Sequence, residues 1–183
     1  MQLEMFERKD EKNALLRRQG YVPAIIYSKG EQNEKIYLQE HALRQILSGM
    51  KGRLATTVFT LVKGKEKIKV IVKDIQYHVA TYEILHVDFL RLSKAEVEIN
   101  VPIIFTGVNE CAGIKLGGFL RQVIRSVKVK CLPSDIPTEF ILDVSNLGVM
   151  QAKRLSDIDM PKKVKPLVNN LNEVVVIVAK AQQ

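Results

Sequence analysis

The amino-acid sequence predicts a mainly β protein with two β-rich domains, and three observations lead to this prediction. Apolar and polar residues alternate in short runs such as "VEINV" and "KIKVIV", and a period of two is typical of half-buried strands. Stretches with a helical pattern are few and short. The pattern changes near residues 93–94, so we expect one domain at residues 1–92 and a second at residues 93–183.

The first half of domain one is expected to mix strands with short helices. A strand is expected at residues 1–8, followed by a short helix or turn that ends at Gly20, because glycine commonly ends a helix. Strands at residues 22–28 and 34–39 flank a glycine-containing turn. A helix follows, because an apolar stripe with helical spacing runs through residues 40–49; its members are Leu43, Ile46 and Leu47.

The rest of the chain is expected to be extended. Residues 53–78 predict a β-hairpin with its turn at residues 63–65, and a strand follows at residues 83–92. Residues 145–161 are expected to be polar connecting chain with at most one turn of helix. The strands of the second domain are expected at residues 95–107, at the end of 113–133, at 138–145 and at 172–180.

Composition points to a soluble protein with a basic surface. The net charge is +8 with 46% hydrophobic residues, and the pI is near 9.5. This charge is compatible with a nucleic-acid partner or with a surface that is simply rich in lysine. No apolar run is long enough for a transmembrane helix, and the N-terminus does not resemble a secretory signal. Cys111 and Cys131 form no CxxC motif, which favours a reducing cytoplasm.

Enzyme motifs are missing from the sequence. There is no P-loop, no GxSxG and no HExxH. The glycines of "GGFLRQ" are best explained by a tight turn, and Cys111 by a small apolar role. We therefore expect a protein that is not an enzyme and has no cofactor.

The strand "EILHVDFLRL", residues 83–92, places a histidine and an acid on the same face. In an extended chain Leu85, Val87 and Phe89 share one face, and His86 and Asp88 share the other. The pair has three interpretations: part of a metal site, a surface pair without function, or a recognition element. A metal site needs further ligands, and the other two histidines do not have ligand-like spacing.

Basic residues gather in two parts of the first domain. Arginine suits phosphates and base edges, and Arg8, Arg17 and Arg18 lie close together in the sequence with Lys12. Asp88 would be repelled by phosphates, so in an RNA site it must accept hydrogen bonds from a base amino group, a 2′-hydroxyl or a metal-bound water. The hairpin lysines are compatible with RNA contacts or with a solvated face that prevents strand aggregation; they are Lys63, Lys65, Lys67, Lys69 and Lys73.

Three segments of the first half, "RKDEKNALLRRQGYVPAIIY", "KDIQYH" and "LHVDF", resemble the bacterial large-subunit ribosomal proteins that bind 5S ribosomal RNA. The match is to their long, two-domain form, the general stress protein Ctc type, and residues 101–147 resemble the C-terminal domain of that form. The order of the segments is the same over almost the whole chain.

This resemblance implies a fold, a partner and a set of site residues. It implies a small closed β barrel with short helices that binds loop E of 5S RNA, and a second β-rich domain. It also implies a cytoplasmic ribosomal component, present as a monomer, that contacts neighbouring large-subunit components and helps to stabilise the central protuberance. The RNA-binding residues implied by the resemblance are Arg8, Lys12, Arg17, Arg18, Tyr27, His86 and Asp88.

One alternative function remains open at this stage. A stress-induced protein–protein adaptor would act mainly through the second domain. The segments "VPIIF" and "EVVVIVAK" are expected to offer it free strand edges, to which a partner strand can be added.

Overall fold

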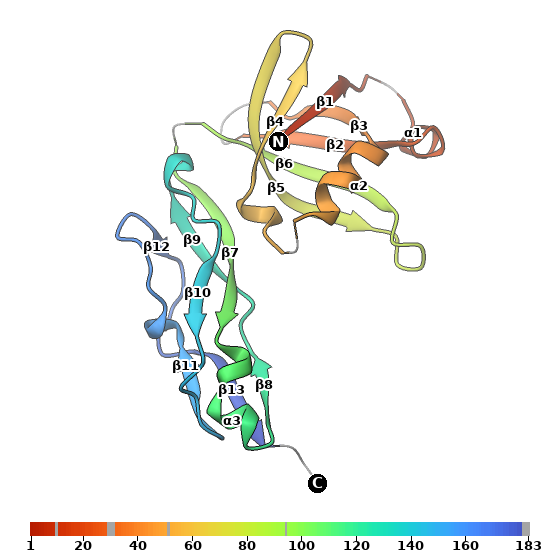
Figure 1. The fold of residues 1–183 in the computed structure, drawn as a ribbon. Helices are drawn as coiled ribbons and strands as arrows, with labels where there is room; N and C mark the ends of the chain where they lie inside the picture. Colours follow the sequence, from red (N-terminus) through yellow and green to blue (C-terminus); the bar gives the residue numbers. More distant parts are fainter. Residues whose placement is uncertain (10, 29–31, 51, 94, 181–183) are drawn as a thin grey trace. The chain divides into compact units, whose positions relative to one another are not determined.

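The computed structural model describes residues 1–9, 11–28, 32–50, 52–93 and 95–180. It is mainly β, as predicted, and divides into two compact units, Met1–Val97 and Glu98–Gln183 (Figure 1). None of the helices in these described ranges is long and apolar enough to cross a membrane.

The first unit is a closed barrel in which the strands are ordered β1-β3-β2-β6-β5-β4. The pairs β1–β4 and β2–β6 are parallel, and the other neighbours are antiparallel. Closure pairs every strand on both sides, which removes the free edges of an open sheet. The strands are β1 (Gln2–Glu7), β2 (Tyr21–Tyr27), β3 (Glu34–Gln39), β4 (Val58–Lys63), β5 (Glu66–Tyr77) and β6 (Ile84–Arg91).

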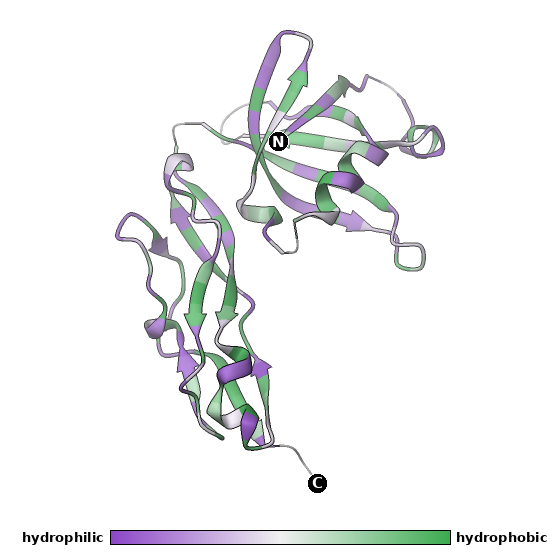
Figure 2. Ribbon diagram, viewed as in Figure 1, coloured by the Kyte–Doolittle hydropathy of each residue, from purple (hydrophilic) through white to green (hydrophobic). Residues whose placement is uncertain are grey.

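Alternate side chains of these strands fill the barrel, and hydrophobic and hydrophilic residues follow one another along them (Figure 2). Phe59 and Phe89 are the largest side chains in this core. The prediction for β6 is correct for Val87 and Phe89 but wrong for Leu85, which is only half-buried while Ile84 lies in the core. A bulge is the cause: the pairing with β5 shifts by one residue just before His86.

The helical elements of this unit are α1 (Asn13–Arg18), α2 (Glu40–Ser48) and the 3-10 turn η1 (Leu54–Thr56). The helices α1 and α2 lie where the sequence predicts them, whereas η1 falls at the start of residues 53–78, where the sequence predicts only a hairpin. Gly20 follows α1 with φ +80°, a left-handed conformation that suits glycine. The apolar stripe of α2 faces the barrel: Leu43 is part of the core, and Ile46 and Leu47 pack against it.

The second unit contains a four-stranded sheet, ordered β10-β7-β9-β12, and a three-stranded sheet, ordered β11-β13-β8. The strands are β7 (Val97–Thr106), β8 (Gly118–Gln122), β9 (Ser126–Cys131), β10 (Phe140–Asp143), β11 (Ala152–Arg154), β12 (Lys165–Pro166) and β13 (Val174–Lys180). The short helical elements are η2 (Val108–Glu110), α3 (Ala112–Lys115), η3 (Pro133–Asp135) and η4 (Leu155–Asp157).

Two expectations for the second unit are corrected. The segments proposed to offer free edges form β7 and β13, and each is a central strand with a neighbour on both sides. The adaptor interpretation therefore loses the two edges on which it depended. The expected connecting chain at 145–161 contains η4, but it also contains the strand β11, which pairs with β13.

Candidate nucleic-acid interface

One line of side chains crosses the outer face of the barrel. The backbone N–H of Arg8, just after β1, donates to the carbonyl of Lys35 at 3.0 Å. Lys35 is paired with Ile25 on β2, Ile25 with Asp88 on β6, and Asp88 with Asp74 on β5. Neighbouring strands are about 4.8 Å apart, so Arg8 and Asp88 lie roughly 15 Å from each other along this line. We call these five residues the cross-barrel row.

The acidic end of the row presents hydrogen-bond acceptors. His86 Nδ1 lies 2.7 Å from Asp88 Oδ1, and the two side chains are 21% and 32% exposed. An ionised carboxylate only accepts hydrogen bonds, so Nδ1 must carry the hydrogen of this bond. In its neutral form the ring then offers the lone pair of Nε2 as an acceptor. Asp88 Oδ2 has no partner among the described residues, and the pair therefore presents two acceptors to a ligand.

Tyr27 lies beside this acceptor pair, two residues after Ile25 on β2. Burial raises the pKa of its phenol, and the nearby charges of Asp88 and Asp74 raise it further. The hydroxyl forms no hydrogen bond with any other residue in the described parts of the chain. At neutral pH Tyr27 is therefore a protonated phenol that can donate a hydrogen bond to a ligand.

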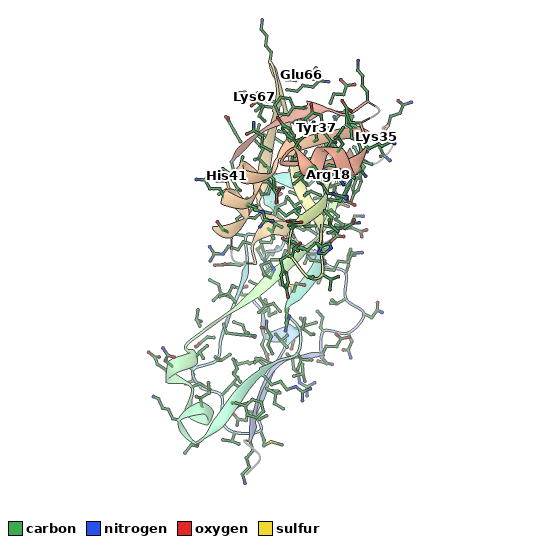
Figure 3. The ribbon with its side chains drawn as sticks, turned by 90° about the vertical axis from the view of Figure 1, so that its right-hand side faces the viewer. Arg18, Lys35, Tyr37, His41, Glu66 and Lys67 are labelled. Atoms are coloured by element: carbon green, nitrogen blue, oxygen red, sulfur yellow. The ribbon has the colours of Figure 1, made fainter. Side chains whose placement is uncertain are left out.

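The bulge in β6 fixes the position of Arg17. The register shift leaves Leu85 without a partner on β5, and its carbonyl accepts a hydrogen bond from Arg17 Nε at 3.1 Å. This bond ties α1 to β6 next to His86. Arg18 follows at the exposed end of the helix, and Lys12 is exposed at the N-cap of α1. Figure 3 shows Arg18 on the side of the barrel where α1 lies, together with Lys35 and Tyr37.

The basic end of the row surrounds a shallow depression. Arg8 donates through Nη1 to Asn13 Oδ1, which links the end of β1 to the first residue of α1. The acid within this region, Glu11, accepts a hydrogen bond from the backbone N–H of Lys9 at 3.0 Å. The depression is thus mainly cationic, and its lining residues are Arg8, Lys9, Glu11, Lys12, Asn13 and Lys35.

An aromatic cluster supports the basic end. The rings of Phe6 and Tyr37 are stacked with centroids 5.3 Å apart, and Tyr21 meets Tyr37 edge-on at 5.1 Å. Phe6 and Tyr37 are directly paired across β1 and β3, two residues before Arg8 and two after Lys35. Such cross-strand aromatic pairs stabilise a sheet, so they hold the strands from which the two cations project.

The structure brings the seven predicted residues to neighbouring parts of one barrel, but it also adds Lys35 and Asp74, which the sequence interpretation missed. Strand alternation in "EKIYLQ" places Lys35 on the outer face. Its position beside Arg8 depends on the pairing of β1 with β3, which alternation does not specify. Among the described residues, no group of three or more His, Cys, Asp or Glu side chains is arranged to hold a metal ion.

Comparisons with known proteins match both halves of the chain. Residues 3–89 match the Ribosomal L25p family, and residues 96–182 match the C-terminal domain of ribosomal protein TL5. The chain is 43% identical to the large ribosomal subunit protein bL25 of Chlamydia trachomatis serovar A, with 98% of this chain and all of the relative aligned. It is 40% identical to the bL25 of Chlamydia abortus and 39% identical to that of Chlamydia pneumoniae, over the same shares of each chain.

Proposed function

The chain belongs to the ribosomal L25p family, in the two-domain form that carries a TL5-type C-terminal domain, and from this we propose a specific role. It is a non-catalytic component of the large ribosomal subunit in the cytoplasm. Its barrel, within proposed domain 1–92, binds loop E of 5S ribosomal RNA and so helps to stabilise the central protuberance. The observation that carries this proposal is the His86–Asp88 acceptor pair, whose Asp88 lies in one row with Arg8 and Lys35.

The two ends of the row suit two different parts of RNA. Cations contact phosphates and set the position of the protein, whereas contacts to base edges discriminate between RNAs. Arg8, Lys35 and the arginines of α1 would contact the backbone. The acceptors of His86 and Asp88 would face RNA donors such as a guanine amino group or a 2′-hydroxyl. Tyr27 adds a donor at the same end.

A salt-titrated gel shift with two RNAs tests this division. One RNA is intact 5S RNA, and in the other loop E is replaced by regular duplex, which keeps the phosphates but removes the irregular base edges. Asp88→Asn replaces an acceptor oxygen with an amide donor. Because a hydrogen bond to a charged group contributes about 1.5–3 kcal/mol, we expect this variant to lose about tenfold or more of the preference for intact RNA.

Asp74→Asn is the matched control, since it removes the same charge from the residue paired with Asp88 but leaves the bond to His86 intact. It should keep the wild-type preference for intact 5S RNA. Arg18→Ala should instead lower the affinity for both RNAs to the same extent and reduce the slope of log affinity against log salt by about one. If Asp88→Asn and the wild type preferred intact 5S RNA equally, the acceptor pair would not read loop E.

A further inference from the structure

The hairpin between β4 and β5 carries cations that the proposed 5S site does not use. It closes through a two-residue turn, Gly64–Lys65, and its tip extends past the neighbouring strands of the barrel (Figure 1). Lys65 lies in the turn, and Lys67 and Lys69 follow on the outer face of β5. All three are exposed, and none forms an ion pair with any described residue. We call these three residues the lysine arm.

The acids near the hairpin belong to its other face. Glu66 is paired with Lys63, and Lys63 Nζ lies 2.7 Å from Glu7 Oε2. This hydrogen bond lowers the pKa of Glu7 and raises that of Lys63. On the outer face, the nearest acid by strand register is Glu4, paired with the residue opposite Lys67. Two strand spacings separate them, roughly 10 Å, so the arm's charge is not neutralised by close contacts.

Protection of a free strand edge does not explain Lys69. Lysines often block edge-to-edge pairing of open sheets. At Lys69, however, β5 is paired on both sides, with Thr60 of β4 and through its carbonyl with the N–H of Leu92. There is therefore no free edge for Lys69 to protect.

The arm is also too far from the acceptor pair to contact the same nucleotides. Asp88 is paired with Asp74 on β5, and Lys69 and Lys67 precede Asp74 by five and seven residues. At about 3.4 Å per residue these distances are roughly 17 and 24 Å. Figure 3 shows Lys67 and Glu66 near the hairpin tip, away from Arg18.

We propose that the lysine arm binds the phosphate backbone of a second RNA segment of the large subunit, outside 5S RNA, so that one barrel bridges two RNAs. This inference rests on the proposed function for the identity of the first RNA. Lysines two residues apart on a strand form an evenly spaced row of point charges, which suits phosphates. A protein partner is less suitable, because lysine is depleted at protein interfaces.

The salt dependence of binding tests the proposal with the full-length protein. The variant Lys65→Gln, Lys67→Gln, Lys69→Gln is compared with wild type on free 5S RNA and on large subunits whose own copy has been washed off. Each lost phosphate contact lowers the salt slope by about 0.9. For the triple variant we expect the salt slope to decrease by about two to three for binding to subunits, and not to change for binding to free 5S RNA. An unchanged slope on subunits, or an equal decrease on 5S RNA, would overturn the proposal.

A charge-matched control separates local contact from net charge. Lys115, Lys162 and Lys180 are exposed residues of the second unit without ion pairs to described residues. Their triple glutamine variant should lower the slope on subunits by less than the arm variant does; an equal decrease would overturn the proposal. If wild type failed to bind 5S RNA, the proposed function would fail, while the subunit measurement would still test the arm.

Cross-linking identifies the partner directly. Lys67→Cys introduces an exposed thiol, whereas Cys111 and Cys131 are 0% and 1% exposed, so a photoactivatable maleimide reagent labels position 67 selectively. In reconstituted large subunits, cross-links to RNA other than 5S support the proposal. Cross-links confined to 5S RNA or to ribosomal proteins would overturn it.

Discussion

At the scale of single residues, the account depends on how Asp88 is placed at the surface of the barrel. Its carboxylate bonds to His86 and lies close enough to Tyr27 for its charge to raise the pKa of that phenol. The barrel therefore holds the acid at its surface next to a donor and an acceptor, which is a suitable environment for reading base edges. Neither Asp88 nor Tyr27 is in the core, where each would need a protein partner.

The pKa of Tyr27 gives a prediction at this scale. The raised pKa means that folding favours the protonated phenol, so this contribution to stability is complete below the ordinary pKa and is lost as pH rises through the folded value. Asp88→Asn should lower the pKa of Tyr27, because one of the charges that raise it is removed, although burial still keeps it above the ordinary value. NMR titration with ¹³Cζ-labelled tyrosine measures the shift.

Asp143→Asn in the second unit is the control for this titration, since Asp143 is not among the groups that act on Tyr27. It should leave the pKa of Tyr27 unchanged. If Asp88→Asn also had no effect on the pKa of Tyr27, the charge of Asp88 would not act on the phenol. Tyr27 would then not form one cluster with His86 and Asp88.

At the scale of elements, close packing of α3 against the three-stranded sheet depends on glycine. A Cβ added at Gly118 would lie 2.7 Å from the carbonyl oxygen of Gly113 and 2.8 Å from Val178 Cγ1. Gly118→Ala should therefore destabilise the second unit by roughly 1–3 kcal/mol, as overpacking does. Hydrogen exchange of the β13 amides measures the loss.

Gly49→Ala is the matched substitution at an open position, where the nearest atom to the new Cβ is 3.7 Å away and φ is −79°. It should change the exchange of α2 little or slow it. Exchange in β13 that is equally slow in Gly118→Ala and wild type would mean that α3 can move away from the sheet at little cost.

Elements also show what could be predicted from the sequence and what could not. The strands of the barrel, α2 and the end of α1 follow from alternation, an apolar stripe and Gly20, because these signals are local. The bulge at Leu85 and the proximity of Arg8 to Lys35 come from pairing between distant segments. The short strands β11 and β12 also exist only through their partners, and no local pattern predicts them.

At the scale of the whole molecule, the barrel separates two kinds of charged surface. The cross-barrel row combines cations with acceptors, whereas the lysine arm is cationic without nearby acceptors. On this basis the first surface would discriminate between RNAs and the second would anchor the protein to phosphates. Burial and strand register place both surfaces on the outer face of one closed sheet.

The most direct test of the central claim is to footprint 5S RNA with two reagents, in the presence of wild-type protein and of Asp88→Asn. Kethoxal reports the base-pairing edge of guanine, and hydroxyl radicals report the backbone. We predict that wild type protects guanine edges and backbone in loop E, and that Asp88→Asn loses the guanine protection while the backbone protection remains. Guanine protection that is identical in the two proteins would contradict the account.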